Sequence, residues 1–356
     1  MRLLALTRYG RQGPSSRIRL LQYLPALQAA GIDVQVKPFF DEDYVAGLYR
    51  GRVSPASVLR PYARRLRAMY GVDQYDVIWL EKEILPWWPE PFERAVAPTS
   101  RPIVVDFDDA VFLRYDRHSS STVRAVLSDK IDGVMRRAAC VIVGNEYLAE
   151  RARKAGSRCV EWLPTVVDLD RYRVRSWEPD EGQRTVVGWI GSPATAHFLQ
   201  LVAPVLGRLS GALNLRCVAI GARADQLSGT PFEPWPWTEE TEADTLGRVD
   251  IGIMPLPDSP FERGKCGYKL IQYMACGVPV IASPVGINRQ IVTPDVGFLA
   301  STEQDWADAL TALATDRARR QTMGGAGRAS VERIYCLQVQ APRFVELLYR
   351  VAGEAH

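Results

Sequence analysis

Two lysines four residues apart are the first candidates for chemistry in this chain. The sequence has 44 basic residues, and only six of them are lysines. Lys265 and Lys269 stand together in the segment GKCGYKLIQYMACGVPVIASPVG, residues 264–286. At about 100° per residue, a helix over 265–276 would hold both lysines and Gln272 on one face. Because like charges at this spacing repel, the pair predicts a strongly negative ligand such as a diphosphate; the alternative is a solvated helix edge.

Two glycines beside these lysines give a second reason to expect an anion. Gly264 and Gly267 would let the backbone approach a ligand closely. Exposed N–H groups and the positive end of the helix dipole favour negative charge at a helix start. We therefore expect the glycine loop and the following helix to hold a diphosphate.

Three aspartates follow an apolar run in the segment PIVVDFDDAVF. Asp106, Asp108 and Asp109 would lie at the carboxyl end of a strand, which is the functional edge of a parallel sheet. Carboxylates there could bind sugar hydroxyls or act as a general base. Helix capping or an ion pair with Arg114 is the alternative. No third ligand accompanies the aspartates, so we expect no metal site.

Two further glycine turns begin helices after strands. The turn RYGRQGPSSRIR places Gly13 after the first strand, with Ser15 or Ser16 as the expected N-cap. In GWIGSPATAH, Ser192 and Thr195 could donate hydrogen bonds to phosphate oxygens, or Thr195 could cap the next helix. Neither turn matches the dinucleotide-binding or phosphate-loop glycine motifs.

Paired tryptophans and a basic helix raise the question of a membrane surface. The segments are ILPWWPEPFERAV, residues 84–96, and RPYARRLRAMYG, residues 60–71. Exposed tryptophan and arginine can dock a protein on an anionic bilayer. Buried tryptophans and a solvated helix face are the alternative.

Short apolar runs alternate with amphipathic stretches along the whole chain, which is typical of parallel α/β sheets. The pattern restarts after the polar segment 160–183. We therefore predict two doubly wound domains in tandem, facing each other across a cleft. Pro25 predicts a kink in the first helix. The expected strands are LLALT, DVQVKPF, DVIWL, PIVVDFDD and CVIVGN, then TVVGWIGSP, LRCVAIGA, DIGIMPL, VPVIASP and VGFLAS.

Composition limits the class of protein and its partners. The 356 residues are 47% apolar and 24% charged, with a net charge of +3, which does not favour nucleic-acid binding. Six scattered cysteines with no CxxC pair argue for a reducing compartment and against structural zinc. The N-terminal apolar run is too short for a signal peptide, and no run reaches the length of a membrane span. We expect a cytoplasmic protein, with peripheral contact at the inner membrane surface as an option.

These segments together resemble the retaining GT-B glycosyltransferases of the group 1 type, family GT4. The resemblance is most specific in DIGIMPLPDSPFERGKCGYKLIQYMACGVPVIASPVGINRQIV, and it extends to GWIGSPATAHFL, VIVGNEYLAE, PTVVDLDRY and GPSSRIRLLQYLPAL. It implies a Rossmann-like acceptor domain over 1–170 and a nucleotide-sugar domain over 184–337. It also implies that the C-terminal helix, about 338–356, packs back on the first domain. The family's first-domain histidine aligns with Asp108.

The chain departs from the family pattern at two charged positions. Most members carry a Glu-x7-Glu pair, which aligns with Gly264 and Gln272 here. The resemblance implies a ribose contact for Gln272 and leaves Glu262 as a stand-in for the first glutamate. An arginine and a lysine that often hold the diphosphate do not follow GWIGSP. We expect Lys265 and Lys269 to supply that charge.

The resemblance implies transfer of a sugar from an NDP-sugar, with retained configuration and with no cofactor or metal. The expected acceptor is a glycan in polysaccharide biosynthesis, a lipid-linked precursor or a small natural product. An NDP-sugar epimerase on the same fold is one alternative. A sugar-binding protein without catalysis and a donor-binding but inactive relative are the others.

Overall fold

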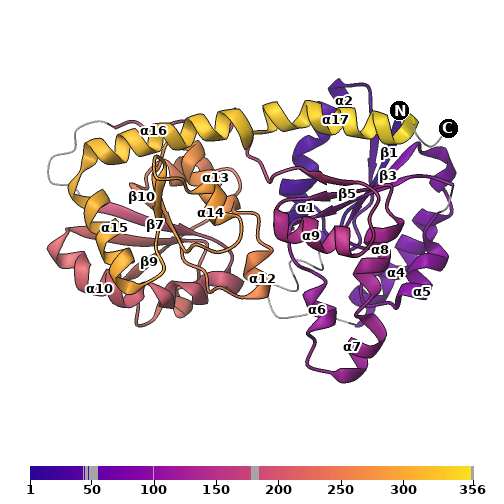
Figure 1. Ribbon diagram of the computed structural model, residues 1–356, viewed down its shortest axis with the longest axis horizontal. Helices are drawn as coiled ribbons and strands as arrows, with labels where there is room; N and C mark the ends of the chain where they lie inside the picture. Colours follow the sequence, from indigo (N-terminus) through magenta and orange to yellow (C-terminus); the bar gives the residue numbers. More distant parts are fainter. Residues whose placement is uncertain (43, 45–46, 48–54, 99, 178–183, 354–356) are drawn as a thin grey trace. The chain divides into compact units, whose positions relative to one another are not determined.

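A computed structural model describes residues 1–356 except 43, 45–46, 48–54, 99, 178–183 and 354–356 (Figure 1). The chain divides into two units. The first unit comprises Met1–Thr165, Gly264–Cys266 and Gln340–His356, and the second comprises Val166–Arg263 and Gly267–Val339. The chain therefore leaves the first unit and returns to it twice.

The first unit is built on a six-stranded parallel sheet with the order β2-β1-β3-β4-β5-β6. Every residue of β3 and β4 is buried, as expected for parallel strands covered on both faces. The strand order reverses between β1 and β3, and ligands of such sheets bind at the carboxyl ends of the strands beside this point. The strands are β1 (Arg2–Leu6), β2 (Asp33–Val36), β3 (Val77–Glu81), β4 (Ile103–Phe107), β5 (Cys140–Val143) and β6 (Val160–Trp162).

The helices of the first unit include the expected interruption near Pro25. The first helix ends at Arg19, and a new helix begins at Leu24 with the proline in its first turn. This break confirms the kink predicted from Pro25. The helices are α1 (Pro14–Arg19), α2 (Leu24–Ala29), α4 (Pro55–Met69), α5 (Glu90–Val96), α6 (Leu113–Asp116), α7 (Ser121–Leu127), α8 (Lys130–Arg137) and α9 (Glu146–Lys154), with 3-10 turns η1 (Leu21–Tyr23) and η2 (Val72–Gln74).

A disulfide joins Cys140 at the start of β5 to Cys159 just before β6. The parallel register sets Val141 opposite Val160, so the two preceding cysteines lie side by side with their Cα atoms 4.6 Å apart. The sequence analysis expected a reducing compartment because the cysteines are scattered. The two bonded cysteines are 19 residues apart in sequence and become neighbours only when β5 pairs with β6. Four further cysteines, Cys217, Cys266, Cys276 and Cys336, are buried free thiols.

The second unit has its own six-stranded parallel sheet, with the order β12-β11-β10-β7-β8-β9. Its strand order reverses between β7 and β10. All five strands predicted in this half are present, and the edge strand β9 was missed. The strands are β7 (Thr185–Ile190), β8 (Leu215–Ile220), β9 (Phe232–Trp235), β10 (Ile251–Met254), β11 (Val280–Ala282) and β12 (Gly297–Leu299).

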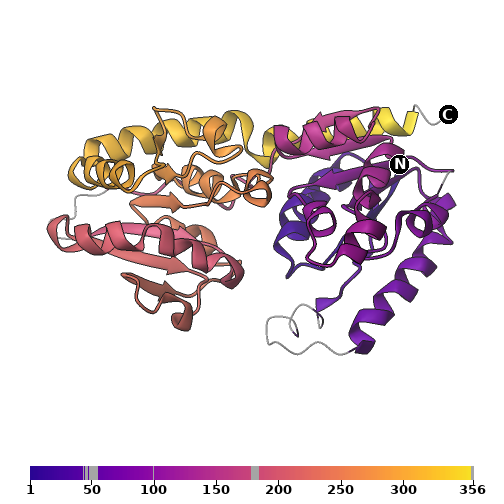
Figure 2. The ribbon, with the colours of Figure 1, turned by 60° about the horizontal axis from the view of Figure 1, so that its bottom comes forward.

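Helices cover both faces of the second sheet, and a separate apolar core fills each face (Figure 2). Helix α16 can approach the end of α13 closely because Gly324 has no Cβ. A Cβ there would lie 1.9 Å from the carbonyl oxygen of Gly277. The helices are α10 (Ala203–Ala212), α11 (Glu242–Leu246), α12 (Pro260–Arg263), α13 (Tyr268–Ala275), α14 (Asn288–Ile291), α15 (Glu303–Thr315) and α16 (Arg317–Ile334), with 3-10 helices η3 (Pro193–Leu201) and η4 (Ala224–Leu227).

The last helix, α17 (Leu337–Gly353), begins in the second unit and continues in the first. Phe344 packs on Trp79 of β3 with ring centroids 4.4 Å apart, and on Tyr23 at 5.5 Å. All three side chains are buried. The final residues of the chain therefore complete the core around its first sheet.

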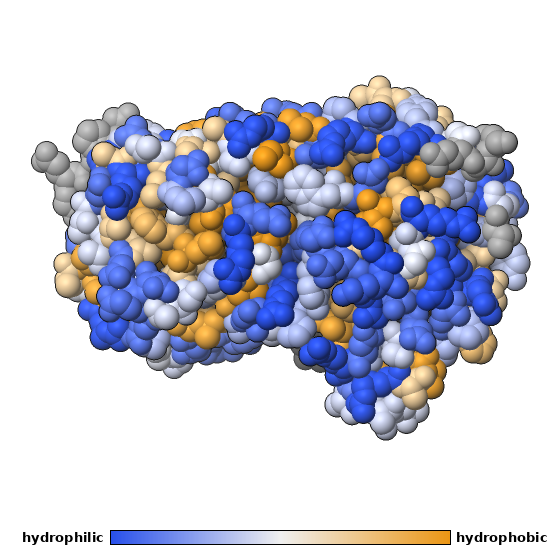
Figure 3. All heavy atoms as spheres, viewed as in Figure 1, coloured by the Kyte–Doolittle hydropathy of each residue, from blue (hydrophilic) through white to orange (hydrophobic). Residues whose placement is uncertain are grey.

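The helices that the structure describes can be compared with the length and apolarity of a membrane span. No helix within the described ranges has the length and apolarity needed to cross a membrane. On the face drawn in Figure 3, hydrophilic side chains cover most of the first unit.

Candidate functional site

The glycine loop before α13 does not form the helix that the lysine spacing predicted. The helix begins at Tyr268, and its N-cap Gly267 has φ 67°, in the left-handed region. A Cβ at Gly267 would also lie 2.3 Å from Cδ1 of Ile291. The helix therefore starts three residues after Lys265, which lies in the loop. The predicted common helical face of Lys265 and Lys269 is wrong, because a left-handed residue between them ends the helical path.

Lys269 lies at the carboxyl edge of the second sheet. Its ammonium nitrogen is 4.8 Å from the ring centroid of Trp189, near the end of β7. A Cβ on Gly191, directly after that strand, would lie 3.0 Å from Cε of Lys269. The lysine thus stands beside the turn GSP, next to the point where the strand order reverses. A cation is held there by an aromatic face, as the cation–π attraction favours.

The two hydroxyl residues of that turn have different surroundings. Ser192 precedes η3 and makes no side-chain cap hydrogen bond. Thr195 donates from Oγ1 to the carbonyl of Ser192 at 3.1 Å, and its backbone N–H donates to the same oxygen at 3.0 Å. Thr195 therefore closes its own turn and does not cap a helix, and its contact with a phosphate stays a prediction.

Gln272 belongs to a buried polar network. It is 3% exposed, and its amide nitrogen donates to the hydroxyl oxygen of Tyr172 at 2.9 Å. Tyr172 in turn donates to Glu242, and the indole nitrogen of Trp237 donates to the other oxygen of Glu242 at 2.6 Å. No sequence pattern pointed to this network, since its members come from three separate stretches of the chain. One donor of the Gln272 amide is thus already used inside the protein.

Glu262 and Gly264 have local roles in the structure. Glu262 lies on α12 and accepts a hydrogen bond from the hydroxyl of Ser259. A Cβ on Gly264 would lie 2.7 Å from Cβ of Ala110, so only glycine fits this contact. Asn145 donates to the carbonyl oxygens of Gly264 and Lys265 at 2.9 and 3.0 Å, which fixes the loop in the first unit.

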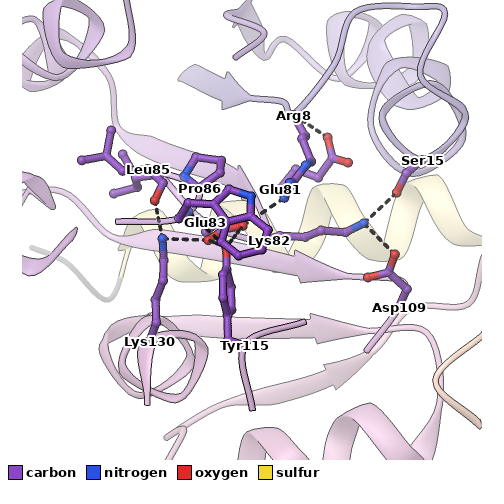
Figure 4. A network of polar contacts seen from close by, with 12 residues as sticks. Arg8, Ser15, Glu81, Lys82, Glu83, Leu85, Pro86, Asp109, Tyr115 and Lys130 are labelled. Carbon is purple, nitrogen blue, oxygen red and sulfur yellow. Dashed lines mark hydrogen bonds and ion pairs between the residues drawn. The ribbon is translucent and has the colours of Figure 1, made fainter. Parts of the chain in front are cut away.

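A cluster of charged side chains lies at the carboxyl edge of the first sheet (Figure 4). Lys82, which directly follows β3, places its ammonium 2.9 Å from Asp108 and 3.1 Å from Asp109. The hydroxyl of Ser15 donates to the other oxygen of Asp108 and lies 3.4 Å from the ammonium. We call Ser15, Lys82, Asp108 and Asp109 the lysine cluster. It occupies the strand-order reversal of the first sheet.

Lys82 is the functional candidate that the sequence analysis missed. It is 4% exposed and has φ 66°, which is uncommon for a residue with a side chain. Its signal was available: a lysine directly after an apolar strand, in a chain with six lysines. Neither Ser15 nor Ser16 caps the first helix as expected, because the N-cap is Gly13. The two hydroxyls donate to Asp108 and Glu81 respectively.

The electrostatics of the lysine cluster favour the charged forms of Lys82 and Asp108. Burial alone would lower the pKa of Lys82, but Asp108 and Asp109 outweigh it and raise that pKa. Burial would likewise raise the pKa of Asp108, but Lys82 and the hydrogen bond from Ser15 lower it to about 2. A carboxylate with so low a pKa is a weak general base. Hydrogen bonding to hydroxyl groups suits the cluster better than proton abstraction.

Asp109 keeps one acceptor position for a ligand. Its Oδ1 is buried and has no hydrogen-bond partner among the residues that the structure describes. Its side chain remains 22% exposed, so the group is not sealed inside the protein. Buried acceptors are normally satisfied, so an unsatisfied one at a strand-end cluster points to a donor from outside.

The third aspartate of this segment is structural. Asp106 receives two hydrogen bonds from the guanidinium of Arg19, at 2.9 and 3.0 Å, and both residues are buried. This is the ion-pair alternative, with Arg19 in place of the expected Arg114. Gly13, the predicted turn residue, packs against Tyr9, since a Cβ there would lie 2.3 Å from Cβ of Tyr9.

A second buried network supports the backbone around Lys82 (Figure 4). Glu83 accepts from Arg8 at 2.9 Å and from Lys130 at 2.8 Å, and the hydroxyl of Tyr115 donates to it. Burial would raise the pKa of Glu83, but Lys130 and Arg8 lower it. Because Glu83 adjoins Lys82, these contacts fix the strained loop that aims the lysine.

Two further predictions concern the paired tryptophans and a metal site. Trp87 and Trp88 are 45% and 37% exposed, so the alternative of buried tryptophans is wrong. They pack edge-on against Tyr115 and Phe92 respectively. Docking of this segment on a membrane surface stays a prediction. Within the described ranges, no three His, Cys, Asp or Glu side chains are grouped to hold a metal ion.

Two doubly wound parallel sheets, each with charged residues at its carboxyl edge, define the GT-B class of α/β fold. Residues 185–316 match a family model described as "Glycosyl transferases group 1". The matched stretch contains β7, the GSP turn and α13. Apart from residues 264–266, the matched stretch lies in the second unit.

Curated relatives match the chain over part of its length. A D-inositol 3-phosphate glycosyltransferase of Pseudarthrobacter chlorophenolicus is 34% identical over 134 residues, 36% of this chain and 30% of the relative. A GDP-mannose-dependent monoacylated alpha-(1-6)-phosphatidylinositol monomannoside mannosyltransferase of Corynebacterium glutamicum is 33% identical over 109 residues, 30% of this chain and 29% of the relative. The chain thus spans about 30% of the length of these relatives.

Solved structures match over nearly the whole chain. Sucrose-phosphate synthase from Thermosynechococcus elongatus has a TM-score of 0.72 at 17% identity, covering 100% of both chains. Anabaena Alr3699/HepE in complex with UDP-glucose has a TM-score of 0.71 at 15% identity, covering 98% of this chain and 100% of that one. At such low identity the likeness shows the fold alone, and it agrees with the two Rossmann-like domains predicted from the sequence.

Proposed function

We propose that the protein transfers a sugar from a nucleoside diphosphate sugar to a hydroxyl-bearing acceptor, with retention of configuration. The observation that carries this proposal is the position of Lys269, beside Trp189 and the GSP turn at the strand-order reversal of the second sheet. That position lies inside the stretch matched by the group 1 family model. The UDP-glucose complex of a structural neighbour supports a nucleotide-sugar donor.

The second unit is proposed to bind the donor, with Lys269 directed at its diphosphate. The bond from the anomeric carbon to the phosphate oxygen breaks, and the leaving diphosphate gains negative charge. A preorganised cation stabilises that charge in the transition state. Lys265 lies in the preceding loop. Its contribution to diphosphate binding is tested separately with Lys265→Ala.

The lysine cluster of the first unit is proposed to bind the acceptor. The Oδ1 of Asp109, which has no hydrogen-bond partner among the described residues, accepts a hydrogen bond from an acceptor hydroxyl, and Lys82 holds both aspartates in place. The acceptor oxygen bonds to the anomeric carbon on the face that the diphosphate leaves. Its proton passes to the departing phosphate oxygen. No protein base is required in this scheme, in keeping with the low pKa of Asp108.

The names of the curated relatives suggest an acceptor class to examine first. One relative is named for inositol 3-phosphate and the other for a phosphatidylinositol monomannoside. Both acceptors are polyols that carry phosphate. We therefore place inositol phosphates and their lipid forms ahead of glycans and small natural products as acceptors.

The test is a matrix of donors and acceptors with the purified protein. UDP-, GDP- and dTDP-sugars are incubated with inositol phosphates, phosphatidylinositol or glycan acceptors, and nucleoside diphosphate release is measured. Release that depends on the acceptor, with a product of retained anomeric configuration by NMR, is the expected result. Absence of transfer with every pair contradicts an active transferase.

A donor-binding protein without transferase activity is the second candidate. Gly264 and Gln272 occupy the positions where the resembled family has glutamates, and the Gln272 amide is bonded to Tyr172. Under this alternative, calorimetry detects NDP-sugar binding while the matrix shows no transfer. The two measurements together separate the candidates.

A further inference from the structure

A cavity of about 450 Å³ lies in the second unit at the amino ends of its strands. Thr185 and Val186, which line it, open β7, and Arg216 is the second residue of β8. Asp250, also in the lining, directly precedes β10. Trp189 and Lys269 lie at the carboxyl end of β7, the opposite edge of the same sheet. The cavity is therefore separate from the proposed donor site.

Arginines dominate the lining of this cavity. Asp250 is the one acidic side chain in the described lining, and it pairs with Arg175 at 2.7 Å. Arg216 pairs with Glu233 at 2.8 Å. The six arginines are Arg175, Arg184, Arg216, Arg248, Arg317 and Arg320.

Three of these arginines lack a carboxylate partner. Among the described residues, no ion pair neutralises Arg184, Arg248 or Arg320. Their guanidinium groups line one cavity, and like charges close together repel. A site built this way is stabilised when negative charge enters it.

Buried hydrogen-bond donors also favour an anion in this cavity. The Nε–H groups of Arg175 and Arg320 are buried and have no acceptor among the described residues. Arg320 is 8% exposed, and it already donates from Nη1 to the carbonyls of Leu313 and Ala314. Burial, together with Arg175 and Arg317, lowers the pKa of Arg320. Unsatisfied buried donors are costly, so an external acceptor would remove a penalty here.

Two tryptophans hold the guanidinium groups in defined planes. Arg175 stacks over Trp177 at 4.1 Å, and Arg248 stacks over Trp235 at 4.7 Å. Arg216 lies over the same Trp235 ring at 5.5 Å. A stacked guanidinium keeps its N–H edge available, and its planar fork matches the oxygens of a phosphate. The donors are thus arranged before a ligand arrives.

We propose that this cavity is a second anion site, which binds a ligand carrying two or more phosphate groups. Three guanidinium charges without a carboxylate partner among the described residues match the charge of an oligophosphate better than that of a single carboxylate. The cavity volume lies in the range of small-ligand sites. The phosphates belong either to a free small molecule or to a lipid headgroup, and the experiment separates the two.

The test uses tripolyphosphate as a probe in isothermal titration calorimetry. Because UDP and GDP carry two phosphates and would themselves enter the cavity, they are omitted, and Lys269→Ala is titrated in parallel to report binding at the proposed donor site. We expect the wild type to bind, and Arg248→Gln to bind about tenfold more weakly, since a charge-assisted contact is lost. Arg248 is chosen because its guanidinium stacks on Trp235 at the surface, so the fold should survive its replacement, and melting curves verify this.

Arg319→Gln is the matched control. Arg319 neighbours Arg320 on α16, but its side chain is 46% exposed and is not part of the lining. The same charge is removed outside the cavity, so affinity for tripolyphosphate should stay at the wild-type value. Equal weakening by both variants would indicate general electrostatic attraction and overturn the proposal.

Three acidic residues of the chain itself require a separate titration. The sequence between Trp177 and Arg184 contains Glu178, Asp180 and Glu181, which lie outside the described residues. A variant with these three changed to their amides is therefore titrated in parallel. Binding by the wild type or by this variant, if weakened by Arg248→Gln, supports the site. Absence of binding by both proteins overturns it.

The source of the phosphates is decided by sedimentation with vesicles. Phosphatidylcholine vesicles with and without cardiolipin are compared for wild type and Arg248→Gln. Binding to cardiolipin that Arg248→Gln weakens assigns a lipid headgroup, whereas tripolyphosphate binding without vesicle binding assigns a free ligand. The donor and acceptor matrix does not involve this cavity, so failure of either proposal is seen independently of the other.

Discussion

At the scale of single residues, a lysine decides the character of each proposed site. Lys82 has a backbone conformation that costs of the order of 1–3 kcal/mol for a residue with a side chain. Two carboxylates and the network around Glu83 hold it there, and such strain is usually kept where function requires it. Lys269 is held instead by an aromatic ring. Lys269 was predicted because it follows a glycine loop. Lys82 was missed because it follows an apolar strand with no glycine motif beside it.

Loss of the Lys269 ammonium should reduce transfer without unfolding the protein. In Lys269→Ala the leaving diphosphate loses a preorganised cation, so we expect turnover to fall by about 10²–10³-fold. Turnover is measured with the donor and acceptor pair found in the matrix, and folding by circular dichroism. Near-native turnover in this variant would contradict the proposal.

Two companion variants complete that measurement. Lys154→Ala removes a lysine that is 77% exposed on α9, and its turnover should equal that of the wild type. Lys265→Ala asks whether the loop lysine takes part. A loss in Lys265→Ala as large as in Lys269→Ala would place both cations in the reaction.

The carboxylate of Asp108 should make stability depend on acidity in a defined window. Its pKa is lowered from 3.8 to about 2 in the folded protein. A group whose pKa is lowered by folding stabilises the fold above its unfolded pKa, and this stabilisation is lost as pH falls through the folded value. The free energy of unfolding should therefore decrease between about pH 4 and pH 2.

That dependence can be assigned with a neutral replacement. Asp108→Asn should have a shallower fall in the urea-derived free energy of unfolding across this window. Asp308→Asn, a change at an exposed position of α15, should keep the wild-type slope. An unchanged slope in Asp108→Asn would show that the ion pair with Lys82 is not formed.

At the scale of helices and strands, one glycine explains why the predicted helix was wrong. The helical arc of two lysines required regular backbone from residue 265 onward, but Gly267 adopts a left-handed conformation. The strands were predicted well, because parallel strands buried on both faces are apolar throughout. The strand β9 was missed since it contains Pro234, which an edge strand tolerates. The disulfide and the lysine cluster could not be predicted, as both depend on which strands become neighbours.

Replacing this glycine should destabilise the start of α13. Gly267→Ala forces a left-handed conformation on a residue with a Cβ, and that Cβ would meet Ile291 at 2.3 Å. We expect a loss of about 1–3 kcal/mol in the free energy of unfolding. Chemical denaturation provides the measurement.

A second glycine provides a control of opposite sign. Gly325 lies inside α16, and a Cβ there would meet nothing within 4 Å. Gly325→Ala should therefore stabilise the helix by about 0.5–1 kcal/mol. A Gly267→Ala variant as stable as wild type would contradict the left-handed assignment.

At the scale of the whole molecule, the chain builds its two units from interleaved segments. The restart of the strand pattern predicted two domains, and the two sheets are present. The domain limits proposed from the sequence stay predictions. What periodicity alone does not reveal is that residues 264–266 and 340–356 are grouped with the first unit. Such grouping follows from side-chain packing, as in the stack of Phe344 on Trp79.

Truncating Phe344 should weaken the first unit, although this residue follows the entire second unit in sequence. Phe344→Ala removes a buried ring from Trp79 and Tyr23, at an expected cost of about 3–5 kcal/mol. Urea unfolding followed by tryptophan fluorescence measures the effect. Glu346→Ala, at an exposed position of the same helix, should change stability by less than about 0.5 kcal/mol. Equal effects of the two changes would contradict the packing of α17.

The interleaved path also has a consequence for synthesis on the ribosome. The residues that cover Trp79 and Tyr23 are translated after the whole of the second unit. Until they emerge, the nascent first sheet exposes an aromatic surface, which is the kind of surface that chaperones bind. A nascent chain stalled near residue 339 should therefore be a chaperone client, and release of the final helix should end that dependence.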